Sequence, residues 1–247
     1  MIEIKIPGSK SITNRALIAA SLAPGKSVLT HTLESDDTRH MMKALQNLGV
    51  KIKRGKNNEL KIYGGNLKKT PKTLFCGNSG TTMRFLTAIL ATQDFESILD
   101  GDHRMRQRPI KDLVDALQQL GTNVIPLQKN NLPPIKVSGP AKAGHCYIKG
   151  GISSQFLSGL LLAAPLAQHD TTIHVTGELV SRPYVDMTID IMEKFGIRIK
   201  RNGYRKFLIK SGQQYRPRTY QIEGDASSAT YFLGISQLTS EEICIPN

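Results

Sequence analysis

Hydrophobic residues form long runs in four parts of the chain, and each run follows the same kind of polar start. One or more glycines come first, then Ser, Thr or Asn, and then small and apolar residues, in 7–23, 76–91, 150–167 and 224–238. Because apolar residues surround nearly the whole circumference of such a helix, the pattern predicts helices that are buried on every side. The segments recur at intervals of roughly 70 residues, which indicates an internal repeat.

A second helix is predicted after each of the first three runs. Hydrophobic residues recur there at helical spacing, so one face of each helix should pack inward. A glycine suited to a helix end follows each of them. The helices lie within 36–54, 108–127 and 182–201, and the glycines are Gly49, Gly121 and Gly196. A short strand and a glycine then close each unit, at 60–64, 133–139 and 207–212.

Together these elements predict an α/β (α+β) fold built of repeated βαβαββ units. Three complete units, approximately 7–66, 67–140 and 141–222, should form one domain over 7–222. A fourth unit has its first helix and one further strand within 223–247. We therefore expect residues 1–6 and 223–247 to begin a second, similar domain that is mostly absent, as in a piece of a longer protein.

The charge balance favours anionic partners. Lys and Arg number 33 against 20 Asp and Glu, a formal net charge of +13. Nucleic acid, acidic lipid and phosphorylated small molecules all suit such an excess. The basic residues are scattered and aromatic residues make up only 6% of the chain, whereas nucleic-acid surfaces combine basic runs with aromatics. We expect no nucleic-acid partner.

The number of cysteines and the lengths of the apolar runs narrow the class of protein further. Cys76, Cys146 and Cys244 are odd in number and widely spaced, which argues against a disulfide framework and against a zinc site. The longest apolar run, 156–167, contains Pro165 and is shorter than the ~20 residues that span a bilayer. The expectation is a cytoplasmic protein with no membrane segment and no metal.

Candidate chemistry gathers at the starts of the buried helices. Lys10 and Arg15 begin the first run, although the helix dipole favours anions at that end. A single Ser or Thr there is expected to be an N-cap. Related starts also carry Arg84 and Gln155, and a glycine-led loop carries Arg108. Such a set of donors suits a phosphate or carboxylate ligand.

Other common site patterns are missing from the sequence. It has no GxxxxGK[ST] loop and no GxGxxG after a strand, the patterns typical of nucleotide binding. It also shows no convincing pair of residues for general acid and base catalysis. Asp36, Asp37 and Asp225 lie near helix starts, where capping is their commoner role.

Six motifs in order give the chain a family resemblance. They are "PGSKSITNRALIAASLA", "GNSGTTMR", "RQRPI", "GGISSQFLSGLLLAAPLA", "VSRPYVDMT" and "IEGDASSATYFL". Over essentially its whole length the chain resembles the 5-enolpyruvylshikimate-3-phosphate synthases, or 3-phosphoshikimate 1-carboxyvinyltransferases. The resemblance implies the enolpyruvyl transferase fold, an inside-out α/β barrel of two similar domains with the active site between them. It also implies transfer of the enolpyruvyl group of phosphoenolpyruvate to the 5-hydroxyl of shikimate 3-phosphate in aromatic amino-acid biosynthesis, with no cofactor.

The same resemblance assigns candidate site residues. Lys10 matches the family lysine that touches both substrates, and it is our one candidate catalytic residue. Gly80 matches a position that makes this family sensitive to glyphosate. The motifs also contain Asn78, Thr81, Arg84 and Tyr184, with less defined roles. Candidates for shikimate 3-phosphate are Lys10, Ser11, Arg15, Ser153, Ser154, Gln155 and Ser181, and those for phosphoenolpyruvate are Lys10, Gly80, Arg108 and Gln155.

The resemblance also implies what residues 1–247 lack. The family's acid and base carboxylates and further arginines belong to the other domain, so we expect no turnover and at most weak binding of shikimate 3-phosphate. The full-length enzyme is expected to be a monomer. The fourth unit should expose Tyr231, Phe232, Leu233 and Ile235, and this apolar surface favours self-association.

Two alternatives stay open at this point. The UDP-N-acetylglucosamine enolpyruvyl transferases have the same repeats, but they carry "GAKN" where this chain has "GSKS". They also have a catalytic cysteine in the loop before "RP", and 101–109 contains none. The other alternative is a non-enzymatic anion-binding or RNA-binding scaffold, for which a steep salt dependence of binding would be expected.

Overall fold

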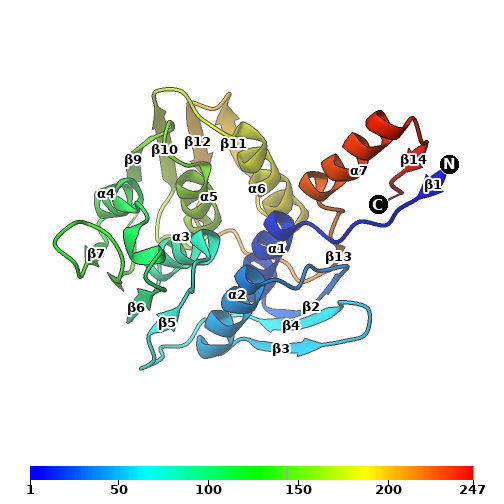
Figure 1. Cartoon of the computed structure of the whole chain (residues 1–247). Coiled ribbons are helices and arrows are strands. Elements are labelled where there is room, and N and C mark those ends of the chain that lie inside the picture. Colours follow the sequence, from blue (N-terminus) through cyan, green and yellow to red (C-terminus); the bar gives the residue numbers. More distant parts are fainter. Residues whose placement is uncertain (143, 247) are drawn as a thin grey trace.

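Three helices form the centre of the molecule. The computed structural model describes residues 1–142 and 144–246, and Figure 1 shows its elements. Every residue of α3 (Gly80–Leu90) is buried, and so are most of those in α1 (Lys10–Leu22) and α5 (Ser154–Ala163), which continues into a short 3-10 turn, Ala164–Leu166. The prediction that the apolar runs are buried helices is confirmed for these three.

Three amphipathic helices lie outside the central ones. They are α2 (Asp36–Asn47), α4 (Lys111–Gln119) and α6 (Arg182–Lys194), and each buries one face. Gly49, Gly121 and Gly196 follow them with φ of 90°, 80° and 90°. Because L-residues avoid this left-handed region, glycine is the residue that ends a helix there at least cost.

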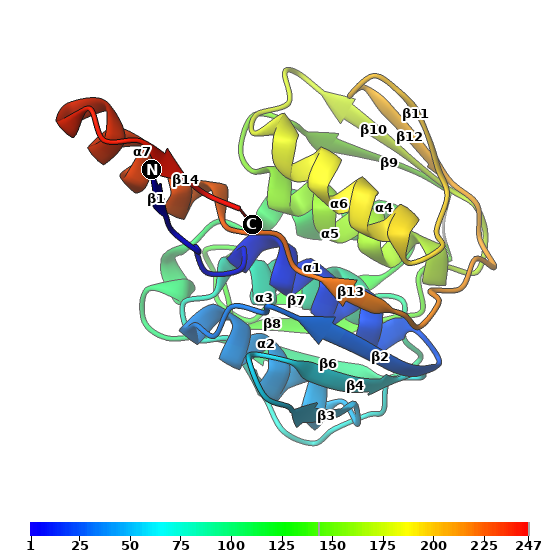
Figure 2. The ribbon, with the colours of Figure 1, turned by 90° about the vertical axis from the view of Figure 1, so that its right-hand side faces the viewer.

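Three four-stranded sheets surround the helices (Figures 1 and 2). In each sheet, one edge strand pairs in parallel with its neighbour, and the remaining two pairs of neighbouring strands are antiparallel. The parallel edge strand is given first in each of the orders below. The second sheet, in spatial order, is β5 (Leu74–Phe75), β6 (Glu96–Asp100), β8 (Ile135–Ser138) and β7 (Asn123–Pro126). The third is β9 (Gly144–Lys149), β10 (Thr171–Thr176), β12 (Lys206–Ile209) and β11 (Ile199–Asn202).

One strand of the first sheet, β13 (Thr219–Gln221), comes from a part of the chain far from the other three strands. In spatial order the first sheet is β13, β2 (Gly25–Thr30), β4 (Leu60–Gly64) and β3 (Lys51–Arg54). Tyr220 pairs with Leu29 in parallel, in the place that β5 and β9 take in the other sheets. The first unit therefore lacks a leading strand of its own, and β13 covers the open edge of β2. The proposed limits of the three units and of the domain remain predictions.

The two ends of the chain lie together, apart from this body. Strand β1 (Ile2–Glu3) pairs in parallel with β14 (Ile243–Cys244), beside α7 (Ala226–Thr239). Figures 1 and 2 show this group projecting from the rest of the molecule. It is joined there by two adjacent backbone segments, in which the Ser9 N–H donates to the Glu223 carbonyl at 2.8 Å and the Asp225 N–H donates to the Pro7 carbonyl at 2.9 Å.

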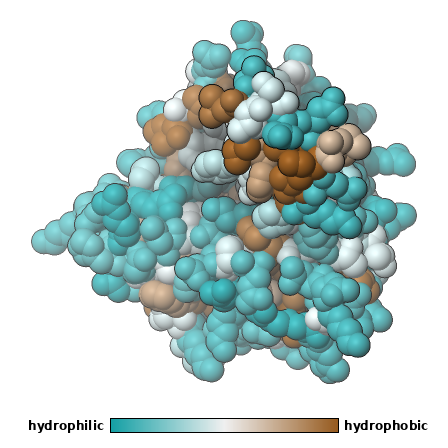
Figure 3. Space-filling view, turned by 45° about the vertical axis from the view of Figure 1, so that its right-hand side comes forward, coloured by the Kyte–Doolittle hydropathy of each residue, from teal (hydrophilic) through white to brown (hydrophobic). Residues whose placement is uncertain are grey.

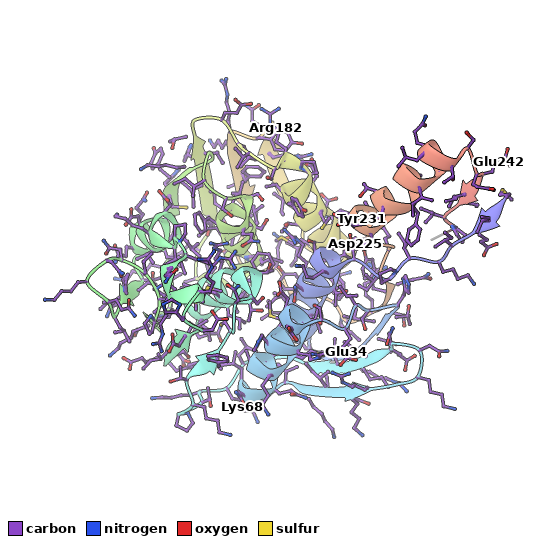
Figure 4. The ribbon with its side chains drawn as sticks, in the orientation of Figure 1. Glu34, Lys68, Arg182, Asp225, Tyr231 and Glu242 are labelled. Atoms are coloured by element: carbon purple, nitrogen blue, oxygen red, sulfur yellow. The ribbon has the colours of Figure 1, made fainter. Side chains whose placement is uncertain are left out.

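No residue of α7 is buried. Tyr231 is 76% exposed and Leu233 55%, Ile235 is also exposed, and Phe232 is partly exposed. Figure 3 shows hydrophobic residues gathered on the upper part of the face toward which α7 projects, and Figure 4 labels Tyr231 near the start of the helix. The predicted exposure of this apolar surface is confirmed. Among the described residues, no helix is both long enough and apolar enough to cross a membrane.

Candidate active site

The starts of α1, α3, α5 and α6 converge on one cleft with a volume of ≈ 450 Å³. All nine site residues predicted from the sequence line it, together with Asn78, Thr81 and Tyr184. The nine come from segments far apart in the chain: Lys10, Ser11, Arg15, Gly80, Arg108, Ser153, Ser154, Gln155 and Ser181. Arg84 does not line the cleft and lies buried behind it. The structure thus brings the predicted set together, while the role of each residue stays a prediction.

Serine side chains cap the three central helices. Ser9 Oγ accepts from the Ile12 N–H, Ser79 Oγ from the Thr82 N–H at 3.2 Å, and Ser153 Oγ from the Gln155 N–H at 3.3 Å. The expectation of capping is therefore correct for these serines. Ser153 caps its helix and lines the cleft as well, so its hydroxyl stands at an end of a helix that favours anions.

Ser181 reaches the cleft by an unusual backbone conformation. It precedes α6 with φ 54° and ψ 44°, in the left-handed region, and its side chain does not cap the helix. A serine in this region costs roughly 1–2 kcal/mol. Such conformations concentrate at functional sites, and Ser181 lines the same cleft as Ser153 and Ser154.

Arg15 is a buried cation whose donors are mostly used within the protein. It is 2% exposed. Its guanidinium donates to Thr188 Oγ1 at 2.7 Å and Ser158 Oγ at 3.3 Å, and to the carbonyls of Ser11 and Tyr184. Burial lowers the pKa of Arg15 to about 10, so it keeps its proton at neutral pH. Because these partners are hydroxyls and carbonyls, Arg15 supplies positive charge to the lining of the cleft that no carboxylate among them neutralises.

Arg84 and Arg108 form a second cationic group. Arg84 is buried and donates to Gln155 Oε1, and also to the Pro109 carbonyl at 3.1 Å. Burial, and to a lesser extent the neighbouring charge of Arg108, lower the pKa of Arg84 to about 10. Arg108 donates to the Asn78 carbonyl at 2.8 Å. Among the described residues, both guanidinium groups donate to amide and carbonyl oxygens and to no carboxylate, and of the two only Arg108 lines the cleft.

Gly80 lies directly under these two guanidinium groups. A Cβ at this position would come 2.6 Å from Arg108 Nη2 and 2.9 Å from Arg84 Nη1. Both distances are shorter than van der Waals contact, so any side chain at 80 would push the arginines aside. The absence of a side chain at Gly80 is what allows Arg108 to occupy this side of the cleft.

Two aspartates near the helix starts have different roles. Asp225 accepts from the N–H groups of Ser227 and Ser228 and so caps α7, as the sequence suggested. It also accepts from the Lys10 N–H at 3.2 Å. Asp37 instead lines the cleft, with its Oδ2 3.5 Å from Lys10 Nζ. The capping role expected from the sequence did not predict this position in the cleft. The sequence signal that could have predicted it is an acidic residue in the first turn of a helix.

The lining is therefore cationic and rich in hydroxyl and amide donors. Asp37 is the one carboxylate among the described lining residues, against Lys10, Arg15 and Arg108. Within the described part of the chain, no three His, Cys, Asp or Glu side chains gather in a way that would hold a metal ion. Such a cleft suits a ligand that carries several negative charges and oxygen acceptors.

The fold and the cleft together define the class: an enolpyruvyl transferase fold of repeated βαβαββ units, with a cationic cleft at the helix starts. This agrees with the solved structure of EPSP synthase from Acinetobacter baumannii at 2.37 Å, which matches at a TM-score of 0.85 and 29% identity over 94% of this chain and 52% of that one. The model of the family EPSP synthase (3-phosphoshikimate 1-carboxyvinyltransferase) matches residues 2–247. The chain belongs to this family, and the predicted fold class and family are confirmed.

Curated relatives agree in sequence and differ in length. The 3-phosphoshikimate 1-carboxyvinyltransferase of Yersinia pseudotuberculosis (strain YPIII) is 47% identical over 240 residues, 95% of this chain and 56% of the relative. The protein of the same name from Shewanella sp. (strain ANA-3) is 48% identical over 247 residues, 98% of this chain and 58% of the relative. The chain thus spans a little over half the length of these relatives.

Proposed function

We propose that this chain serves enolpyruvyl transfer, in which phosphoenolpyruvate gives its enolpyruvyl group to the 5-hydroxyl of shikimate 3-phosphate and inorganic phosphate is released. One observation carries the proposal: the nine positions assigned by resemblance line a single cationic cleft. The names of the curated relatives support it. The reaction belongs to the shikimate pathway, and a cytoplasmic enzyme that acts without a cofactor fits this assignment.

For shikimate 3-phosphate, the proposal uses the hydroxyl-rich side of the cleft. Ser153, Ser154 and Ser181 would donate to the 3-phosphate, and the charge of Arg15 beneath them would attract it. Gln155 would reach the sugar from the start of α5. Hydrogen bonds to an ionised phosphate are stronger than neutral ones, so these hydroxyls should account for most of the affinity.

For phosphoenolpyruvate, the proposal uses the part of the cleft where Gly80, without a side chain, lets Arg108 approach the backbone. Lys10 is half-exposed at the mouth of the cleft, where its ammonium could contact both substrates. Fixed cations would then stabilise the charge that develops on the departing phosphate. Glyphosate would compete for this side of the cleft.

The chemistry needs groups that this cleft does not supply. Asp37 is the single carboxylate of the described lining, and it has no second acidic side chain beside it there to share general acid and base catalysis. We therefore propose that residues 1–247, produced alone, bind shikimate 3-phosphate without turning it over. Exposed apolar residues on α7 would promote self-association of such a chain, which sedimentation velocity over a range of concentrations would detect.

Calorimetric titration with shikimate 3-phosphate in phosphate-free buffer tests the proposal. Inorganic phosphate and UDP-N-acetylglucosamine are the controls. Ser181→Ala should weaken binding of shikimate 3-phosphate about tenfold, the loss of one charge-assisted hydrogen bond. Arg201→Lys, which changes an exposed ion pair with Asp186 outside the cleft, should leave it unchanged. Equal binding of shikimate 3-phosphate and inorganic phosphate would contradict the assignment.

A further inference from the structure

Gln155 offers the cleft only one of its two polar atoms. Its Oε1 accepts a hydrogen bond from Arg84 Nη1. A guanidinium group donates and cannot accept, so the amide oxygen must face Arg84 and the amide nitrogen must face away. Gln155 Nε2 donates to Thr81 Oγ1 at 3.5 Å, and both residues line the cleft. This bond uses one of the two amide hydrogens and leaves the other for a ligand. The amide is therefore turned so that it presents a donor to a ligand.

Arg84 is itself held firmly enough to impose this orientation. It is 6% exposed, and its guanidinium carbon lies 5.1 Å from the centre of the Phe156 ring. Its second terminal nitrogen donates to the Pro109 carbonyl at 3.1 Å. Contacts from α5 and from the loop before α4 thus hold the guanidinium group that α3 carries, and it has little freedom to rotate away from Gln155.

The alternative orientation of the amide would be costly. Turning Gln155 over would place its NH2 group against the Arg84 guanidinium, donor against donor. It would also leave a buried cationic donor without an acceptor, and the loss of such a hydrogen bond costs roughly 1.5–3 kcal/mol. A free glutamine at a helix start would sample both orientations, so the single orientation here is a consequence of Arg84.

We propose that Arg84 is a positioning residue, which orients the Gln155 amide as a hydrogen-bond donor toward an oxygen acceptor of the bound substrate. This inference rests on the proposed function, because it takes shikimate 3-phosphate as the ligand of Gln155. Arg84 has no contact with the ligand in this account. It acts through Gln155, and its contribution to binding should disappear when Gln155 is absent.

A double-mutant cycle on binding of shikimate 3-phosphate tests this dependence. The four proteins are the unmodified chain, Arg84→Met, Gln155→Ala and the double variant. Each single substitution should weaken binding about tenfold, and the double variant should bind within about twofold of either single variant. If the two losses multiply to about a hundredfold, Arg84 acts independently of Gln155 and the proposal is wrong. Where Arg84→Met does not fold, Arg84→Gln replaces it, since an amide can either donate or accept and fixes no orientation.

The side-chain amide signal of Gln155 gives a readout that does not depend on the ligand. In a ¹H–¹⁵N spectrum it is identified by its loss in Gln155→Ala. Arg84→Met should shift this signal, whereas Arg201→Lys, a change in a distant arginine, should not. An unchanged Gln155 signal in a folded Arg84→Met protein would overturn the proposal. Failure of the unmodified chain to bind shikimate 3-phosphate, with the expected shift of the amide signal, would instead refute the proposed function.

Discussion

Lys10 Nζ lies 3.5 Å from Asp37 Oδ2, so the most accessible cation of the cleft is paired with the only carboxylate that lines it among the described residues. Both side chains are partly exposed, so the pair contributes little to stability. Its effect is on the site: Asp37 restrains Lys10 at the mouth of the cleft and reduces the net positive charge there. An incoming anion competes with Asp37 for the same ammonium group.

Asp37→Asn tests this competition. Removal of the carboxylate leaves Lys10 free for a ligand, so affinity for shikimate 3-phosphate should rise about two- to fivefold, the range expected for an exposed pair. Calorimetry at low ionic strength measures the change, with Asp36→Asn as the matched control because Asp36 pairs with Arg39 outside the cleft. Weaker binding by Asp37→Asn would show that Asp37 contacts the ligand instead.

Arg15→Met should destabilise the fold. The substitution keeps the volume but removes the donors to Thr188, Ser158 and two carbonyls in a region that excludes water. Lost hydrogen bonds of a buried charge cost about 2–4 kcal/mol in the free energy of unfolding. Urea denaturation measures this, and Arg201→Lys should change it by less than about 0.5 kcal/mol. A change below 1 kcal/mol in Arg15→Met would contradict the structural role of Arg15.

Gly80→Ala should alter both the site and the fold. The new methyl group would meet the end of the flexible Arg108 side chain, which can move, and also Arg84 Nη1 at 2.9 Å, which is held by its own hydrogen bonds. The free energy of unfolding should therefore fall by roughly 1–3 kcal/mol. The hydrogen bond from Arg108 to Asn78 should be lost, and a crystal structure of the variant would show a displaced guanidinium. Arg108 in its original place would show that the position tolerates a side chain.

Asp186 should make the stability of the fold depend on pH in the acidic range. Burial alone would raise the pKa of Asp186, but hydrogen bonds from Tyr204 and Arg201 outweigh it, and the pKa is lowered from its usual value of 3.8. A carboxyl group with a lower pKa in the folded state contributes stability above its unfolded pKa, and this is lost as pH falls through the folded pKa. Asp186→Asn should therefore flatten the fall in melting temperature below about pH 4. An identical acid profile would contradict the effect.

The hydrophobic pattern was sufficient to predict that α1, α3 and α5 are buried, because small and apolar residues cover nearly their whole circumference. The same pattern was wrong for α7, which has no buried residue. The pairing of β13 with β2 could not be predicted in the same way. Tyr220 and Leu29 are far apart in sequence, and parallel pairing over such a separation leaves no local signal. The repeat pattern alone assigned the first unit a leading strand of its own.

Within the site, sequence predicted which residues meet but not how they are used. The polar helix starts predicted that Lys10, Arg15 and Gln155 would gather around an anion, and the structure brings all three to one cleft. The hydrogen bonds that occupy Arg15, and the one by which Arg84 orients Gln155, depend on side chains from other helices. Such relationships arise from packing and are visible only in three dimensions.

The most direct test is a ¹H–¹⁵N spectrum of residues 1–247 titrated with shikimate 3-phosphate, with inorganic phosphate as the control. We predict that the largest shifts caused by shikimate 3-phosphate fall at Ser153, Ser154, Gln155 and Ser181. Inorganic phosphate should produce only part of this pattern. Shifts confined to other surfaces, or identical shifts with both ligands, would contradict the claim that the convergent helix starts form the binding site for shikimate 3-phosphate.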